Sequence, residues 1–231
     1  MRLDERSELI YNFMMNILML LRSTFPPDIR IEKEMDILKE HRIYLLCMRE
    51  NNKPKLEMFN NTQLLRLVPV NALKKLNDII LYRYNFDCLF FLGLRKAQDK
   101  IKDIDVIHVH DLLLANTAIR FAKKRNIKVV LDLHENYPEG LQCWQSWDTS
   151  FFAKLKQKIF FNYKRWCKYE KRAVDECHHI IAVVEEMKQF LITKHQVSDE
   201  KITVFSNTEP ESFSEQQVDQ GIISQYENQF I

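Results

Sequence analysis

Short aliphatic runs that alternate with segments of ten or more helix-forming residues constrain this fold more than any other feature of the sequence. Strands separated by helices pair in parallel, because each helix carries the chain back to the edge where the next strand starts. Both faces of such a sheet are covered, so its strands are continuously apolar. The sequence therefore predicts an α/β fold with a doubly wound, Rossmann-like parallel sheet. The expected strands are 17–21, 43–47, 64–68, 106–109, 129–133, 180–183 and 202–205.

The segments between these runs predict the helices. Asp28 can cap a helix whose apolar residues recur at helical spacing from Ile31 to Leu38. The polar stretch 49–63 has no expected element, and a long loop is expected at 134–150. The remaining helices are expected at 72–100, interrupted near Asn85 or Gly93, and at 112–125, 151–175 and 185–194.

Glycine is scarce, which excludes one class of nucleotide site. The three glycines among the 231 residues, Gly93, Gly140 and Gly221, lie far apart in the sequence. A dinucleotide fingerprint or a Walker loop needs at least two glycines within about eight residues, because only backbone without side chains approaches phosphate so closely. The chain therefore has no glycine-built phosphate loop.

The charge and the cysteine content exclude further classes. The 34 basic and 32 acidic residues give a formal net charge of +2, which provides no overall attraction to nucleic acid or membrane. The five cysteines form no CxxC pair, which argues against a disulfide framework or zinc knuckle and suits a reducing cytosol. The apolar run 13–21 is too short for a bilayer span and lacks a cleavage site, so we expect neither an anchor nor a signal peptide.

Two polar clusters lie at the ends of predicted strands, where doubly wound sheets bind their ligands. The first contains His108, His110 and Asp111, and the second contains Asp132, His134 and Glu135 and is followed by Glu139. Three interpretations stay open on the residues alone. The side chains could finish strands and cap helices, with Asp111 as an N-cap, or they could hold zinc or iron. Alternatively, the imidazoles and nearby backbone N–H groups could stabilise charge that develops on a substrate.

The segment DVIHVHD at 105–111 resembles a strand end in the amino-terminal domain of family 4 GT-B glycosyltransferases, which are retaining enzymes that use nucleotide-sugar donors. Four further segments are similar to that domain in the same order, so their joint occurrence is more specific than any single motif. They are FPPDIR with EKE at 25–34, similar to the P-x-D-x-R loop subgroup, VLDLHE with PE at 130–139, AVD with IIAVVEEM at 173–187, and KITVFSNT at 201–208.

The resemblance implies the amino-terminal, acceptor-side half of a GT-B fold. It assigns the catalytic role to His110, whose imidazole would face the interdomain cleft and stabilise charge near the transferred sugar. It implies no metal and no cofactor, because a helix N-terminus and basic side chains hold the phosphates of the nucleotide-sugar substrate. The acceptor- or substrate-binding residues would be Asp28, Arg30, His108, Asp111, His134 and Glu135.

The sequence departs from the family at three places. Pro26-Pro27-Asp28 replaces a common glycine pair, which leaves the acceptor open, and Val184 replaces a serine that would cap the following helix. The domain that binds the nucleotide sugar is expected after a linker and is missing from this sequence. The expected division is a polar leader at 1–14, a Rossmann-like acceptor-side domain at 15–207, and a linker with the start of the donor-binding domain at 208–231.

These observations predict the function of the complete enzyme. It would be a hexosyltransferase that moves a sugar to a saccharide or lipid-linked acceptor in cell-surface polysaccharide synthesis, and this chain alone would be inactive. Two alternatives stay open. One is a non-catalytic binding module, or half of a split enzyme whose partner chain supplies the donor domain. The other is a metal-dependent hydrolase built on His108, His110, Asp111 and His134.

A basic segment gives a separate signal. Residues 151–172 carry eight cations and one acid, Glu170. Such a helix face could hold the protein on an anionic leaflet, at about 1 kcal/mol per cation, or it could be an ordinary solvated face. The first interpretation places the protein in the cytoplasm, peripheral on the inner face of the membrane, with no nucleic-acid partner. The candidate cations at helical spacing are Lys154, Lys158, Arg165, Lys168 and Arg172.

Overall fold

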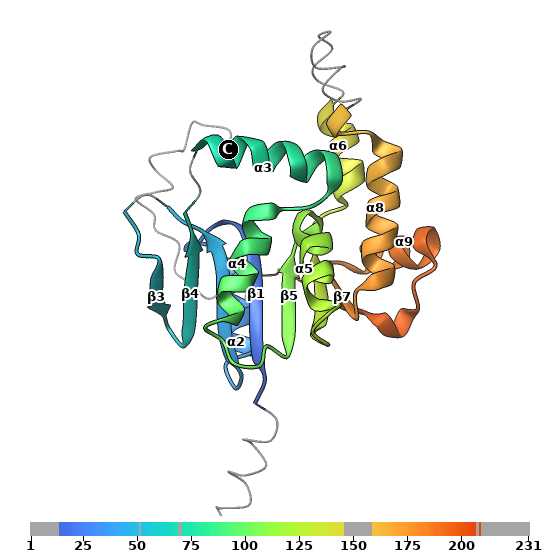
Figure 1. The fold of residues 1–231 in the computed structure, drawn as a ribbon. Coiled ribbons are helices and arrows are strands. Elements are labelled where there is room, and N and C mark those ends of the chain that lie inside the picture. Colours follow the sequence, from blue (N-terminus) through green and yellow to red (C-terminus); the bar gives the residue numbers. More distant parts are fainter. Residues whose placement is uncertain (1–13, 51, 69–70, 146–158, 207, 209–231) are drawn as a thin grey trace, which may run out of the picture.

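The computed structural model describes residues 14–50, 52–68, 71–145, 159–206 and 208, and these form one eight-stranded sheet with helices on both faces (Figure 1). The strand order is β3-β4-β2-β1-β5-β6-β7-β8. The strands are β1 (Asn16–Thr24), β2 (Arg42–Met48), β3 (Leu56–Phe59), β4 (Thr62–Leu67), β5 (Val106–His110), β6 (Lys128–Leu133), β7 (His179–Ala182) and β8 (Ile202–Val204). All neighbours pair in parallel except β3 and β4, so the predicted Rossmann-like α/β class is confirmed.

The helices largely follow the predicted order. They are α2 (Ile29–Ile37), α3 (Asn71–Tyr84), α4 (Cys88–Gln98), α5 (Ala115–Ala122), α6 (Tyr137–Gln145), α8 (Tyr163–Glu176) and α9 (Glu185–His195), with 3₁₀ turns at Leu112–Leu114 and Asp199–Lys201. The break in 72–100 lies at Asn85, whose φ of 54° lies in the left-handed region that ends a helix. Asp28 caps α2 as predicted, because its side chain accepts a hydrogen bond from the backbone N–H of Arg30.

Two expectations were wrong. The polar stretch 49–63 contains β3, which pairs antiparallel with β4 at the sheet edge. The expected long loop after 133 contains α6, which begins at Tyr137 and carries Pro138 in its first turn, where proline is tolerated. The start of the predicted helix 112–125 also differs, since Leu112–Leu114 form a 3₁₀ turn before α5.

The sheet separates two hydrophobic clusters. The larger one contains Phe90 of α4, Phe121 of α5 and Trp166 of α8, all fully buried against one face. On the opposite face α2 packs through Ile31 and Met35 in a smaller cluster. Figure 1 shows α4 and α5 on the near side of the sheet and α2 behind it. The sheet is therefore doubly wound, and α2 is the helix that covers its second face beside β1 and β2.

The strand order changes direction at β1. The chain goes from β1 to β2 on one side, and the later strand β5 pairs with β1 on its other side. Ligands of such sheets bind outside the carboxyl ends of the strands at this switch point. The fold therefore directs attention to the end of β5, where the sequence predicted a site. Within the described residues, no helix combines the length and apolar character needed to cross a membrane.

Candidate functional site

Alternate residues of β5 lie on opposite faces of the sheet. Ile107 and Val109 are buried in the larger hydrophobic cluster, whereas His108 and His110 lie on the face that α2 covers. The parallel register places Asp132 of β6 opposite His110. The predicted clusters at the two strand ends therefore meet, and they do so beneath α2.

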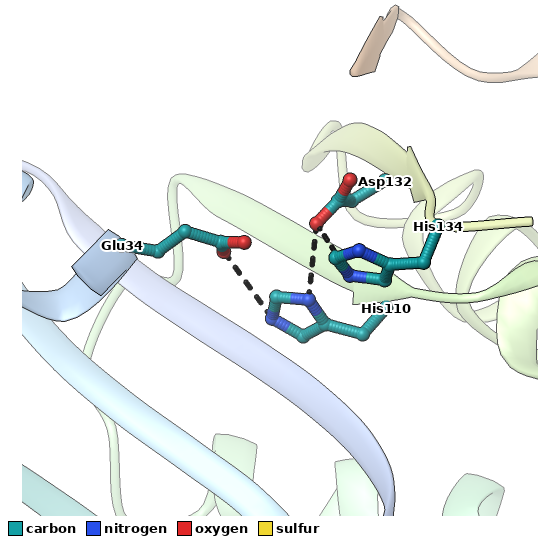
Figure 2. A group of neighbouring side chains, drawn as sticks. All are labelled: Glu34, His110, Asp132 and His134. Carbon is teal, nitrogen blue, oxygen red and sulfur yellow. Dashed lines mark hydrogen bonds and ion pairs between the residues drawn. The ribbon is translucent and has the colours of Figure 1, made fainter. Parts of the chain in front are cut away.

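The meeting point is a buried group of imidazoles and carboxylates (Figure 2). Asp132 Oδ2 lies 3.2 Å from Nδ1 of His110 and 3.0 Å from Nε2 of His134. Glu34 of α2 approaches from the other side, with Oε2 3.7 Å from Nε2 of His110 and 3.5 Å from Nε2 of His108. The rings of His110 and His134 are stacked, with their centroids 5.8 Å apart. We name these five residues, Glu34, His108, His110, Asp132 and His134, the histidine–carboxylate cluster.

Burial controls the protonation of the cluster. Burial, together with the neighbouring His108, lowers the pKa of His110 to about 4, so this imidazole is neutral at pH 7. Burial and the charge of Asp132 raise the pKa of Glu34 to about 10, which keeps that carboxyl protonated. Burial opposes ionisation of Asp132 as well, but the three histidines outweigh it and hold the pKa of Asp132 below its usual range. Asp132 in turn raises the pKa of His134 against the effect of burial. The cluster thus holds one charged carboxylate and one neutral carboxyl group.

The residue that follows β5 has an unusual backbone. Asp111 has φ 67° and ψ 157°, a region that is essentially restricted to glycine. Its backbone N–H donates a hydrogen bond to the Asp132 carbonyl, which ties the two strand ends together. Burial raises the pKa of the Asp111 carboxyl. Such strain costs about 1–3 kcal/mol and tends to occur at functional sites.

Other predicted residues lie around this strand end. Asp28 and Arg30 form an ion pair, with 2.8 Å between Oδ2 and Nη2, and the guanidinium lowers the pKa of Asp28 despite burial. Arg30 also interacts electrostatically with Asp111. Glu135 follows the end of β6 and is exposed as a whole residue. Partial burial of its carboxyl group and the nearby Asp111 raise its pKa. The structure thus brings together all seven residues predicted for catalysis and substrate binding, but it buries the two histidines of β5 deeply.

Glu34 was not among the predicted residues, and Asp132 was placed in the second polar cluster but was given no role in the site. Asp132 interrupts an otherwise aliphatic strand in the same alternation phase as His134. Glu34 lies on the apolar stripe of α2 between Ile31 and Met35, all three of which are buried. A charged residue at an apolar position of the helical or strand period was the signal that could have found them.

The cluster is also the group in the described part of the chain whose ligand atoms could meet at a metal ion. One ligand atom from each of Glu34, His110, Asp132 and His134 can be chosen so that all four lie within 4.8 Å of one another. Imidazole nitrogens and carboxylate oxygens form the ligand set typical of zinc and related divalent metals.

The structure changes the picture of the basic helix. Lys154 and Lys158 lie outside the described residues. Arg165 is not a free surface cation, because its guanidinium donates hydrogen bonds to backbone carbonyls of Tyr82, Arg83, Ile159 and Phe160. Lys168 and Arg172 are exposed on α8.

The chain resembles known proteins in its sequence and in its fold. The model of the family described as Glycosyltransferase Family 4 matches residues 38–208. No curated protein matches the chain significantly. Sucrose-phosphate synthase from Thermosynechococcus elongatus has a similar structure, with a TM-score of 0.57 and 11% identity, over 83% of this chain and 48% of that chain.

Two plant proteins show the same likeness. UGT71G1 from Medicago truncatula gives a TM-score of 0.57 at 13% identity, over 97% of this chain and 59% of that one. UGT89C1 from Arabidopsis thaliana gives a TM-score of 0.50 at 13% identity, over 92% of this chain and 56% of that one. The likeness concerns the fold, and the chain spans about half the length of these three proteins.

Proposed function

Because the chain belongs to Glycosyltransferase Family 4, we propose that it is the acceptor-side domain of a retaining glycosyltransferase of the P-x-D-x-R loop subgroup. The complete enzyme would break the bond between the donor sugar and a nucleoside diphosphate and form a bond from the same anomeric carbon to an acceptor hydroxyl. The acceptor would be a saccharide or a lipid-linked saccharide in cell-surface polysaccharide synthesis. The UGT71G1 structure is a complex with UDP-glucose, which supports a nucleotide sugar as donor.

The observation that carries this proposal is the position and protonation of His110. It ends β5 beside the switch point of the sheet, and the strained Asp111 follows it. Its Nδ1–H donates a hydrogen bond to Asp132, so Nε2 is the atom left for a substrate group. Glu34 lies 3.7 Å from that nitrogen, and we propose that substrate binding displaces it. A neutral imidazole held by a carboxylate is preorganised to stabilise developing charge.

The residues at the exposed margin of the cluster fit the acceptor side of the site. Arg30 and Glu135 present a guanidinium and a carboxylate near Asp111, and both groups form hydrogen bonds readily with sugar hydroxyls. Asp28 orients Arg30 through two hydrogen bonds to the guanidinium. We therefore assign Asp28, Arg30, Asp111, His134 and Glu135 to acceptor binding, with His108 beneath them.

We further propose that the donor-binding domain lies outside residues 15–207 and that this domain alone does not transfer sugar. The absence of a glycine-built phosphate loop from the sequence supports this division. An open hollow of about 560 Å³ borders α2 near Phe205 and Thr208, and the large side chains of Ile29 and Ile37 are 59% and 60% exposed beside it. A second domain that follows residue 208, or one on a partner chain, could pack there.

Membrane association is proposed on a surface that differs from the predicted one. The side chains of Leu73, Leu76 and Ile79 lie one turn apart on α3 and are each more than half exposed. Lys74 and Lys75 are exposed on the same helix. Figure 1 shows α3 across the end of the sheet at which β5 stops. Apolar and basic side chains combined on one helix favour binding at an anionic membrane surface.

The proposal is tested on the complete enzyme with nucleotide-sugar donors. His110→Ala should lower kcat about 100-fold or more, the scale for losing one preorganised electrostatic group. The matched control is His179→Ala, which removes a histidine outside the cluster that contacts Thr203. Near-normal turnover of His110→Ala would refute the catalytic role of His110. Inversion at the anomeric carbon, read by NMR of the product, would refute the retaining mechanism.

A further inference from the structure

The histidine–carboxylate cluster leaves buried acceptor atoms without donors. Both carboxyl oxygens of Glu34, Nε2 of His110 and Oδ1 of Asp132 are buried, and none has a hydrogen-bond partner within the described part of the chain. Glu34 is 5% exposed, while His110 and Asp132 are each 1% exposed. Unpaired polar atoms at this depth are costly, and four of them from three residues in one place indicate a shared electron-pair acceptor, such as a metal ion.

The charges in the cluster point to the same partner. Two carboxyl groups from different elements, Glu34 on α2 and Asp132 on β6, are buried close together, and the groups that contact them are imidazoles. Arg30 interacts with both carboxyl groups at longer range, but it donates its hydrogen bonds to Asp28. A divalent cation would displace the proton that Glu34 holds in the metal-free protein, and it would balance both carboxylates without requiring any further basic residue.

The spacing of the atoms suits a small cation. Two ligand atoms bound tetrahedrally at about 2.0–2.1 Å from a zinc-like ion lie about 3.3–3.4 Å from each other. Glu34 Oε2 lies 3.7 Å from Nε2 of His110, and one ligand atom from each of Glu34, His110, Asp132 and His134 lies within 4.8 Å of the others. Oδ2 of Asp132 already holds His110 through Nδ1, which is the outer carboxylate contact that orients most metal-binding histidines, and Oδ1 of Asp132 remains as a ligand atom.

We propose that the cluster is a binding site for a divalent transition metal of the zinc class, with ligands drawn from Glu34, His110, Asp132 and His134. The ion would link α2 to the ends of β5 and β6, because these residues belong to all three segments. This site goes beyond the transferase function, but it uses the same Nε2 of His110, so a bound ion and a substrate group would compete for that atom. The family resemblance implied no metal, so the site would be a feature of this chain.

The test uses the 231-residue chain after removal of metal with a chelator. Co²⁺ is added first and then Zn²⁺, and bound metal per chain is measured by mass spectrometry after desalting. We expect one Co²⁺ per chain, with visible ligand-field absorption from nitrogen and oxygen ligands, and its displacement by one Zn²⁺. The ligand-field absorption reports coordination directly, so a merely structural role of these residues would not produce it.

Two variants and two controls locate the ion. Glu34→Gln and His110→Gln should each weaken binding about 100-fold or more, since loss of even an outer-shell partner costs about 10–100-fold. His179→Gln and Cys143→Ser change a histidine and an exposed thiol outside the cluster and should bind normally. Glu34→Gln keeps the size of the side chain, so it decides the question if His110→Gln fails to fold.

Three results would overturn the proposal. These are the absence of stoichiometric binding by the wild-type chain, binding that survives Glu34→Gln, and an equal loss of binding in either control. None of these failures would weaken the transferase proposal, because that mechanism uses His110 without a metal. Failure of the metal site and failure of the transferase function are therefore distinguishable.

Discussion

On one face of β5 and β6 the side chains of Ile107, Val109 and Leu131 are fully buried among aliphatic groups, whereas on the opposite face His110 and Asp132 are buried just as deeply among polar ones. The same two strands produce both environments through alternate residues. The first environment is stabilised by burial of apolar surface and by close packing. The second contains charged groups and unpaired acceptors, which oppose folding unless something compensates them.

The difference separates stability from chemistry. The packing of Ile107, Val109 and Leu131 responds to changes in volume and is indifferent to pH, because these side chains do not titrate. The polar face responds to protons and ions, because its energy depends on which carboxyl group is ionised. A buried ionisable carboxyl group lowers the free energy of unfolding, and proteins typically retain such a group in the core only at functional sites. Substitutions on each face should therefore differ in sign and in pH dependence as well as in size.

The largest effect is expected on the apolar face. Phe121 of α5 is fully buried, and Phe121→Ala removes most of its side chain. We expect the free energy of unfolding to fall by about 3–5 kcal/mol, from lost transfer energy and an unfilled cavity. Urea denaturation measures the change. Lys124→Ala, an exposed substitution just after the same helix, should stay within about 0.5 kcal/mol. A loss below about 1 kcal/mol for Phe121→Ala would show that the apolar face repacks freely.

A smaller effect of opposite sign is expected on the polar face. The folded chain raises the pKa of Glu34 to about 10, from an ordinary value of 4.5. Above pH 4.5 the unfolded chain therefore releases a proton that the folded chain keeps, so stability falls as pH rises toward 10. The slope approaches about 1.4 kcal/mol per pH unit for one such group.

Glu34→Gln removes this titration and keeps the shape. In metal-free protein we expect the variant to be more stable than the wild type by roughly 1–3 kcal/mol at pH 7, and the difference should grow between pH 5 and 8. Urea denaturation at several pH values measures it. Asp36→Asn changes an exposed carboxylate on the same helix and should show no such trend. A difference that does not depend on pH would mean that Glu34 is ionised in the folded protein.

The two faces also differ in how far the sequence predicts them. The strands 106–109 and 129–133 were predictable because buried parallel strands form continuous apolar runs. β3 was not, because an edge strand pairs on one side only and its side chains remain half-exposed or exposed. α6 was missed because Pro138 and Gly140 resemble a loop, whereas proline fits the first turn of a helix.

The candidate site was predicted in part. Its histidines could be located because they end strands, and parallel strands bring their carboxyl ends to one edge. Glu34 interrupts an apolar stripe, but the sequence does not show that it meets these histidines. It reaches the cluster from α2, which precedes β5 by many residues and approaches it only in the folded structure. Nor did the motif show that His110 is covered. The depth of a strand-end side chain depends on the helix above it, and here that helix is α2.

The smallest effect concerns close packing on the apolar face. Gly93 lies inside α4, and a Cβ added there would be 2.7 Å from Cδ2 of Leu67 and 3.1 Å from Cδ2 of Leu46. Gly93→Ala gains about 1 kcal/mol of helix propensity and loses about 1–3 kcal/mol through overpacking. We therefore expect a net loss of about 1 kcal/mol, measured by urea denaturation and unchanged between pH 5 and 8, in contrast to Glu34→Gln.

The same substitution can be compared in the wild-type chain and in a Leu67→Ala variant. Leu67→Ala removes the methyl groups that the new Cβ would meet, so in that background Gly93→Ala should become neutral or stabilising by up to about 1 kcal/mol. The reversal of sign measures steric coupling between α4 and β4 directly. If Gly93→Ala has the same effect in both backgrounds, the close approach of Leu67 does not limit the packing of α4. The apolar face would then accept an added methyl group at Gly93 without steric cost.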